Sequence, residues 1–243
     1  MKISKTGLFI MLAISLTGYN PFNLEAQINL NLKSVPTSTE AASGLKEALN
    51  IGIKKAVDVL GKPNGFSTDK EVKIAFPEEI KKVDKTLRSV GLGKLSDDFI
   101  KQLNTSAEKA VVLATPILID AIKSMTFDDA MKILMGGEGS ATKYFETKTN
   151  TNLYSAFKPK VKEVLDQYGV SASYSTLMTK YNAMPFVSKA NTDLTDYVTK
   201  QTLKGLFLKL VQEENKIRND ANLRPSPLLQ KVFGYVNQKS PAK

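Results

Sequence analysis

The sequence contains no histidine and no cysteine. Without histidine it cannot form a Ser-His-Asp or Cys-His triad, and it lacks both the usual zinc ligand and the commonest general base at neutral pH. Without cysteine it cannot form disulfides, hold an iron–sulfur cluster or use a thiolate as a nucleophile. These absences exclude the most common nucleophilic, zinc and thiol enzymes and leave carboxylate chemistry as the main catalytic option.

Carboxylates are plentiful, but no motif singles out a pair of them. A glycosidase needs two carboxyl groups about 5 to 9.5 Å apart across a cleft, and no spacing in the sequence marks such a pair. Asp128, Asp129 and Glu138 do not match the oxygen-ligand pattern of an EF-hand. We therefore predict no catalytic residue, no metal site and no cofactor, and keep a carboxylate-dependent hydrolase as a weaker alternative. The acids considered are Asp120, Asp128, Asp129, Glu138, Glu163, Glu213 and Glu214.

The sequence also lacks an apolar run of about 20 residues, the length that a membrane-spanning helix needs. The shorter run Leu8–Leu16 follows a basic start and precedes polar residues. This order is typical of a secretory signal peptide, and we place its cleavage after Ala26. Residues 1–26 are therefore predicted to be removed on export, and the mature protein is expected to be periplasmic and without a transmembrane segment.

Residues 16–19 have the order of a bacterial lipobox, except that Tyr19 stands where the acylated cysteine would lie. This position therefore offers no thiol for lipid attachment. We expect the exported protein to carry no lipid anchor.

Positive charge is in excess, because 34 lysines and arginines face 24 aspartates and glutamates, for a formal net charge of +10. The basic residues are spread along the chain and are not interleaved with aromatic residues in the manner of a nucleic-acid groove. Most of them are expected on solvated helix faces. Nucleic acid is therefore not an expected partner, whereas lipid headgroups and anionic envelope polymers are candidates.

Apolar residues recur at helical spacing along most of the chain after residue 38. Residues 72–77 alternate weakly and allow at most one short extended segment. We predict an all-α, single-domain bundle of eight to ten helices over residues 40–236, between a flexible leader at 27–39 and a flexible tail at 237–243. Before the glycine-rich loop, the predicted helices cover 39–60, 77–90, 96 to a kink or break at Pro116, 117–125 and 127–135. After the loop, one helix begins at 140 and a helical stretch runs through Leu153 to Gly169 with a bend at Pro159. The remaining predicted helices cover 174–183, 193–217, which is expected to be the longest, and 226–233.

The fold is expected to turn at Ser124–Phe145, where a short amphipathic helix ends in a glycine-rich loop and another helix begins. Gly136 ends the first helix, while Gly137 and Gly139 allow positive φ before Ser140 caps the next helix. Backbone N–H groups at such a helix start can bind an anion. No G-K-[ST] motif and no preceding strand support a phosphate loop, so a helix-loop-helix corner is the favoured interpretation.

Several aromatic residues follow this loop, and we interpret them first as core packing and second as the wall of a ligand pocket. Such a pocket would lie where they meet the loop, with Lys143 and Arg218 as anion partners. The pairs Lys209–Glu213 and Glu214–Arg218, each four residues apart on one helix, are interpreted as surface support. The aromatic residues are Tyr144, Phe145, Tyr154, Phe157, Tyr174, Tyr181 and Phe186. The candidate ligand-binding residues are Gly136, Gly137, Gly139, Ser140, Lys143, Tyr144 and Arg218.

Several motifs occur in a fixed order along the chain. They include Leu87–Gly93, Met125–Phe145, Tyr197–Phe207 and Leu228–Gly234. With these motifs, residues 40–235 resemble the bacterial family catalogued as domain of unknown function 4197. The resemblance implies an exported, mostly helical envelope protein, in many members a lipoprotein, and it implies no known activity, ligand or catalytic residue.

The sequence thus favours a non-enzymatic exported envelope protein that binds a hydrophobic or anionic ligand or a protein partner. A structural or interaction protein of the envelope is the alternative. An exposed apolar patch would favour that alternative over a closed cavity between helices. The identity of any ligand or partner and the oligomeric state stay open.

Overall fold

The computed structural model describes residues 34–126, 128, 130–188 and 192–239. The predicted signal peptide, Phe127, Asp129 and the end of the predicted tail lie outside the described residues. Within them the chain forms eight α-helices and two short 3-10 helices and no strand, which confirms the predicted all-α fold. The elements are α2 (Ser38–Leu60), η1 (Glu78–Ile80), α3 (Lys81–Ser89), α4 (Gly93–Ser124), α5 (Ala130–Met135), α6 (Ser140–Gln167), α7 (Val170–Asn182), α8 (Leu194–Asn219), η2 (Ala221–Leu223) and α9 (Pro227–Lys239).

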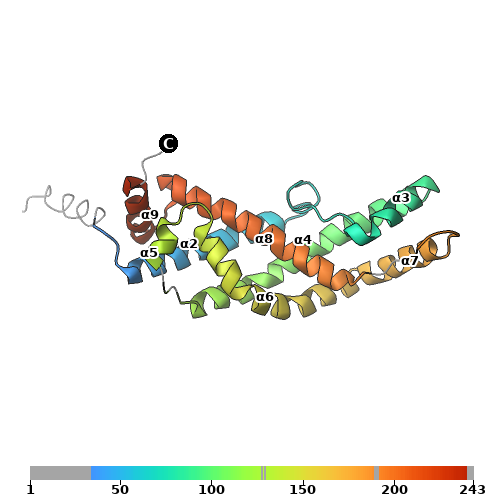
Figure 1. The fold of residues 1–243 in the computed structure, drawn as a ribbon, viewed down its shortest axis with the longest axis horizontal. Coiled ribbons are helices and arrows are strands. Elements are labelled where there is room, and N and C mark those ends of the chain that lie inside the picture. Colours follow the sequence, from blue (N-terminus) through green and yellow to red (C-terminus); the bar gives the residue numbers. More distant parts are fainter. Residues whose placement is uncertain (1–33, 127, 129, 189–191, 240–243) are drawn as a thin grey trace, which may run out of the picture.

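The molecule is elongated, and its long helices lie roughly along its length (Figure 1). Helix α2 contacts α4 and α8, while α6 contacts both α4 and α8 from another side. Helices α3 and α7 form one end of the molecule, and α5 and α9 lie at the other end (Figure 1). Helix α6 therefore has one flank along α4 and one along α8.

Local sequence signals set several helix starts. Thr37 and Glu40 form a capping box at α2, in which the Glu40 N–H donates to Thr37 Oγ1 at 3.1 Å and the Thr37 N–H donates to Glu40 Oε2 at 2.9 Å. At α8, Asp193 Oδ1 accepts from the Asp196 N–H at 2.9 Å, so the Asp193 side chain caps the helix. Gly169, at φ 70°, makes the turn between α6 and α7.

Neither internal proline ends a helix. Helices α4 and α6 run through Pro116 and Pro159 without interruption and reach 32 and 28 residues. The separate helix expected after Pro116 is therefore the second half of α4, and α8, with 26 residues, is not the longest helix. Both prolines lie on exposed faces, where water can satisfy the carbonyl group that loses its hydrogen bond to the proline nitrogen.

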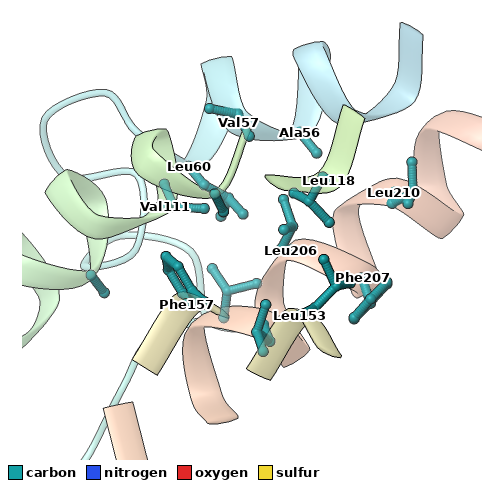
Figure 2. Packing of buried hydrophobic residues seen from close by; sticks show 14 of the residues in the cluster. Ala56, Val57, Leu60, Val111, Leu118, Leu153, Phe157, Leu206, Phe207 and Leu210 are labelled. Atoms are coloured by element: carbon teal, nitrogen blue, oxygen red, sulfur yellow. The ribbon is translucent and has the colours of Figure 1, made fainter. Parts of the chain in front are cut away.

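The core lies where α2, α4, α6 and α8 meet (Figure 2). Its centre is aliphatic, and phenylalanine side chains fill the space between the helices. Burial of these side chains from water supplies most of the driving force for folding. Figure 2 labels Ala56, Val57, Leu60, Val111, Leu118, Leu153, Phe157, Leu206, Phe207 and Leu210 among the buried residues.

A long irregular connection, residues 61–77, joins α2 to η1 and packs across the bundle. The Ile74 N–H donates to Asn104 Oδ1 at 2.9 Å, and Asn104 Nδ2 donates back to the Ile74 carbonyl at 2.7 Å. Phe66 is buried, and a Cβ at Gly205 of α8 would lie only 3.2 Å from its ring. The short extended segment expected at 72–77 thus pairs with a side chain of α4 and not with another strand.

Candidate functional site

The glycine loop between α5 and α6 has the positive φ angles that the sequence predicts at two of its positions. Gly137 has φ 85° and Gly139 has φ 68°, whereas Gly136 lies outside the left-handed region. Gly139 is the N-cap of α6, and the expected capping by the Ser140 side chain is wrong. The Ser140 hydroxyl turns back toward α5, where it donates to the Ile133 carbonyl at 2.6 Å. The loop is therefore closed by its own hydrogen bonds.

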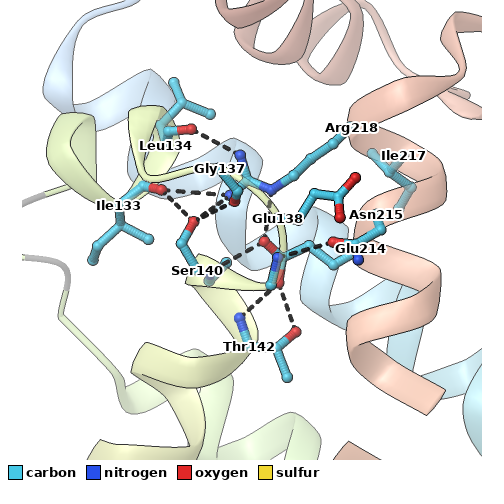
Figure 3. Close-up of polar contacts among 12 residues, drawn as sticks. Ile133, Leu134, Gly137, Glu138, Ser140, Thr142, Glu214, Asn215, Ile217 and Arg218 are labelled. Atoms are coloured by element: carbon cyan, nitrogen blue, oxygen red, sulfur yellow. Dashed lines mark hydrogen bonds and ion pairs between the residues drawn. The ribbon is translucent and has the colours of Figure 1, made fainter. Parts of the chain in front are cut away.

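The anion at the start of α6 is a carboxylate of the protein itself (Figure 3). Glu214 of α8 accepts from the Ala141 N–H at 3.1 Å and from the Thr142 N–H at 2.7 Å. The Thr142 hydroxyl adds a third hydrogen bond to Glu214, of 2.6 Å. Glu214 thus occupies the N–H groups that the sequence offered to an external anion.

Arg218 holds Glu214 from the opposite side (Figure 3). Its Nε donates to Glu214 Oε1 at 2.7 Å, and its remaining donors reach the Leu134 carbonyl and Ser140 Oγ, each at 2.8 Å. The guanidinium also lies 5.3 Å from the ring centroid of Phe233 in α9. This single side chain connects α8 to α5, the loop and α9.

The Glu214–Arg218 pair is buried, so its interpretation as surface support is wrong. The side chains are 2% and 4% exposed. Four-residue spacing predicts the pair but not its burial, because the covering elements come from distant parts of the sequence. A buried pair is tolerated when hydrogen bonds satisfy both partners, and the contacts in Figure 3 meet that condition.

The expected Lys209–Glu213 pair does not form. Lys209 instead lies 2.7 Å from Asp69 and 3.0 Å from Glu71 in the 61–77 connection. Burial opposes the charge of Lys209, but the hydrogen bonds to these two acids outweigh it and raise the lysine pKa. Glu213 pairs with Lys216 at 2.5 Å. A contact from 138 residues away in the sequence thus replaces the local one.

The structure separates the predicted site residues into two groups. Gly136, Gly137, Gly139 and Ser140 form the loop that Arg218 contacts (Figure 3). Lys143 is exposed, and the Tyr144 hydroxyl points away from the loop to the Thr126 carbonyl, at 3.1 Å. The role of these residues in ligand binding stays a prediction.

The aromatic residues do not gather around the loop. Phe145, Phe157 and Tyr181 are buried in the core, which agrees with the interpretation of the aromatic residues as core packing. Phe186, in contrast, is fully exposed and has φ 64°. No common aromatic wall is formed by the described members of this set.

A groove of about 660 Å³ lies between α4 and α6. Its floor is apolar and built from small and aliphatic side chains, namely Ile117, Ala121, Leu153 and Ala156. Its volume falls within the range of ligand sites in proteins, about 300 to 1,000 Å³. Tyr144, one of the predicted site residues, lines this groove rather than the glycine loop.

Charged side chains stand along the rim of this groove. Asp120 pairs with Lys123 at 3.1 Å, and both side chains are about 70% exposed. Lys148 Nζ lies 5.6 Å from the ring centroid of Tyr144. Asp128 also lines the groove. The arrangement can hold an apolar chain on the floor and a polar group at the rim.

The other flank of α6 carries a second groove of about 520 Å³, facing α8. Here the Tyr154 hydroxyl donates to Asp196 Oδ1 at 2.5 Å, and Lys200 pairs with the same carboxylate at 2.8 Å. These two hydrogen bonds hold the pKa of Asp196 below its ordinary value. This groove is smaller than the α4/α6 groove, and the pair of Asp196 and Lys200 takes up two of its four charged side chains.

The sequence analysis did not identify Ile117 and Ala121 as groove residues, whereas Leu153 belongs to the core and also lines the groove. The signal was present in α4, where Leu118 and Ile122 form one apolar stripe and Ile117 and Ala121 form a second stripe beside it. Two adjacent stripes are more than one core face needs. Only the packing of α6 decides which of the two stripes stays accessible.

Among the residues that the structure describes, no group of three or more acidic side chains is placed to hold a metal ion. Every described helix is too short or too polar to cross a bilayer.

Comparison with known proteins gives one match. The sequence model of a family described as "Protein of unknown function (DUF4197)" matches residues 35–234. Neither a search of curated proteins nor a search of solved structures found a match.

Proposed function

The chain belongs to the DUF4197 family of proteins of unknown function, and we propose that it is a non-enzymatic binding protein of the cell envelope. Its ligand is apolar in part and lies in the groove between α4 and α6. The observation that carries this proposal is the accessible apolar floor of that groove. Ligand sites in proteins are commonly concave and lined by apolar and aromatic side chains with a few polar groups, and this groove has that composition.

Apolar surface continues beyond the groove along α4. Leu113 lies one turn before Ile117 on the same face and is 40% exposed, and its neighbour Val112 is 48% exposed. The apolar strip is therefore longer than the groove itself. An elongated ligand fits this shape better than a compact one.

The groove residues offer little to catalysis. Asp120 and Asp128 are the carboxylates that line it, and Asp120 is exposed to water and paired with Lys123. Binding is therefore the function that the geometry supports best. A carboxylate-dependent hydrolase remains the weaker alternative.

The location in the envelope rests on the N-terminal sequence. Leu8–Leu16 after a basic start supports export with cleavage after Ala26, and Tyr19 in place of a lipobox cysteine supports a protein without a lipid anchor. We expect mass spectrometry of the protein from the periplasmic fraction to find Gln27 at its N-terminus. Recovery of the chain with Met1 intact in that fraction would contradict this part of the proposal.

The groove itself is tested by filling it. Ala121 and Ala156 face the groove, so Ala121→Trp and Ala156→Trp place indole rings on its floor. Ala172→Trp is the matched control, because Ala172 is exposed on α7 and lines none of the described grooves. Nile red, an uncharged apolar dye, serves as the probe, and its fluorescence reports binding.

We expect the native chain and Ala172→Trp to bind Nile red alike, and each groove variant to bind it at least about tenfold more weakly, a loss of about 1.4 kcal/mol. Native mass spectrometry of protein purified gently from its own envelope gives an independent result. A co-purifying molecule should be present in the native chain and absent from Ala156→Trp. Equal dye binding by all four proteins would overturn the proposal.

A further inference from the structure

Two opposite charges at one end of the α4/α6 groove lack ion-pair partners among the described residues. Asp128 and Lys148 both line the groove, and each has no oppositely charged group within 4.0 Å in the described parts of the chain. The Tyr144 hydroxyl bonds to the carbonyl of Thr126, two residues before Asp128, and Lys148 lies over the Tyr144 ring. Tyr144 therefore places the two charges at the same end of the groove.

The two sides of this end differ in sign. The α4 side carries Asp120 and the last turn of α4, where Lys46 Nζ donates to the Lys123 carbonyl at 3.0 Å and offsets the negative end of the helix dipole. Asp128 follows that turn, and the α6 side carries Lys148. The ion pair between Lys123 and Asp120 is weak because both side chains are exposed to water, so Asp120 can still attract a cationic group. A ligand at this end thus meets negative charge on one side and positive charge on the other.

We propose that the α4/α6 groove binds a zwitterionic amphiphile with one apolar chain, an amine and a phosphate. The chain lies on the floor over Ile117, Ala121 and Leu153. The amine faces the carboxylates of Asp120 and Asp128, and the phosphate faces Lys148. This inference rests on the proposed function, since it names the ligand class of the same groove.

Charge complementarity distinguishes this ligand from simpler amphiphiles. A purely anionic headgroup would meet Lys148 but also the two carboxylates, and a purely cationic one would meet the carboxylates but also Lys148. Only a headgroup with both charges has a favourable partner for each. Such charge patterns contribute more to specificity than to total affinity.

The experiment uses three probes with the same twelve-carbon chain, each below its micelle concentration. They are dodecylphosphocholine, which is zwitterionic, dodecyl phosphate, which is anionic, and dodecyltrimethylammonium, which is cationic. Displacement of Nile red from the full-length protein measures the affinity of each. We expect dodecylphosphocholine to bind about five- to tenfold more tightly than either of the others, a difference of about 1 to 1.4 kcal/mol.

Charge-neutralising variants then assign the two halves of the headgroup. Lys148→Met should remove the preference over dodecyltrimethylammonium, and the double variant Asp120→Asn/Asp128→Asn should remove the preference over dodecyl phosphate. The controls are Lys160→Met on α6 and Asp58→Asn on α2, two exposed positions outside the groove. These controls should keep the preferences of the native chain.

The outcomes separate this inference from the proposed function. If the three probes bind equally and Ala156→Trp still weakens all of them, the zwitterionic headgroup is wrong and the apolar groove stands. If Nile red binding does not respond to Ala156→Trp, the proposed function fails and this inference fails with it. Tighter binding of dodecyl phosphate or dodecyltrimethylammonium than of dodecylphosphocholine also overturns the inference.

Discussion

Glu214 and Arg218 show how much of this protein depends on two side chains. Their contacts join the start of α6 and the end of α5 to α8, and Arg218 also contacts α9 (Figure 3). Because both are buried, the loss of either charge leaves the other without its counterion in a low-dielectric interior. The pair is therefore a structural centre of the fold, and it lies beside the loop that contains several of the candidate ligand-binding residues.

We predict that Glu214→Gln lowers the free energy of unfolding by about 3 to 5 kcal/mol, the usual cost of removing one partner of a buried ion pair. Urea unfolding followed by circular dichroism measures the change. The control is Asp98→Asn, which breaks the exposed Lys94–Asp98 pair and should cost less than about 1 kcal/mol. Equal losses in the two variants would show that burial does not set the energy of the Glu214 contact.

A carboxyl group at the N-terminus of α8 makes the stability of the protein depend on pH in the acid range. The hydrogen bond from the Asp196 N–H and the ion pair with Lys158 together hold the pKa of the Asp193 carboxyl below its ordinary value of 3.8. A group with a lowered folded-state pKa stabilises the protein above its ordinary pKa, and that contribution is lost as the pH falls through the folded-state value. The contribution of Asp193 should therefore be constant near neutrality and disappear below about pH 4.

Asp193→Asn tests this titration, because asparagine caps a helix about as well as aspartate but carries no charge. We expect the native chain to be more stable than the variant at pH 7 and the difference to shrink toward zero at pH 2 to 3. Urea unfolding at a series of pH values gives both curves. A difference that stays constant with pH would exclude Asp193 as a contributor to the acid sensitivity.

At the scale of elements, the 61–77 connection depends on α4. Asn104 binds both the N–H and the carbonyl of Ile74, as a paired strand would. A buried N–H group without an acceptor costs about 1 to 3 kcal/mol, so this connection should loosen when the amide of Asn104 is removed.

We predict that Asn104→Ala accelerates trypsin cleavage after Lys70 and Lys73, which both lie in the connection, more than cleavage elsewhere. Mass spectrometry of early digestion products identifies the sites. Gln102→Ala is the control, since Gln102 is exposed on the same helix. Acceleration at all sites alike would indicate global destabilisation and would contradict a local role for Asn104.

At the scale of the whole molecule, the shape in Figure 1 gives a direct prediction for solution scattering. Helix α4 alone, with 32 residues at 1.5 Å each, is about 48 Å long. A compact domain of this size would have a radius of gyration of about 17 Å. We expect small-angle scattering of the monomer to give a clearly larger value, and a value near 17 Å would contradict the elongated arrangement.

The helical class and most helix positions follow from the sequence, because α2 and α8 carry local signals such as caps and apolar stripes. Local signals failed where tertiary packing decides. Packing keeps α4 continuous through Pro116, and the fold of distant segments buries Arg218 and turns Lys209 toward Asp69. The candidate groove was missed for the same reason, since its two walls belong to separate helices, α4 and α6.

Pro116 has a mechanical consequence for the groove. The floor residues Ile117 and Ala121 belong to the part of α4 that begins directly after this proline, where the helical ladder lacks one hydrogen bond. Helices bend most readily at such a point. We expect bending at Pro116 to move one wall of the groove relative to α6, so the width of the proposed binding site should depend on the backbone of α4 as well as on the side chains.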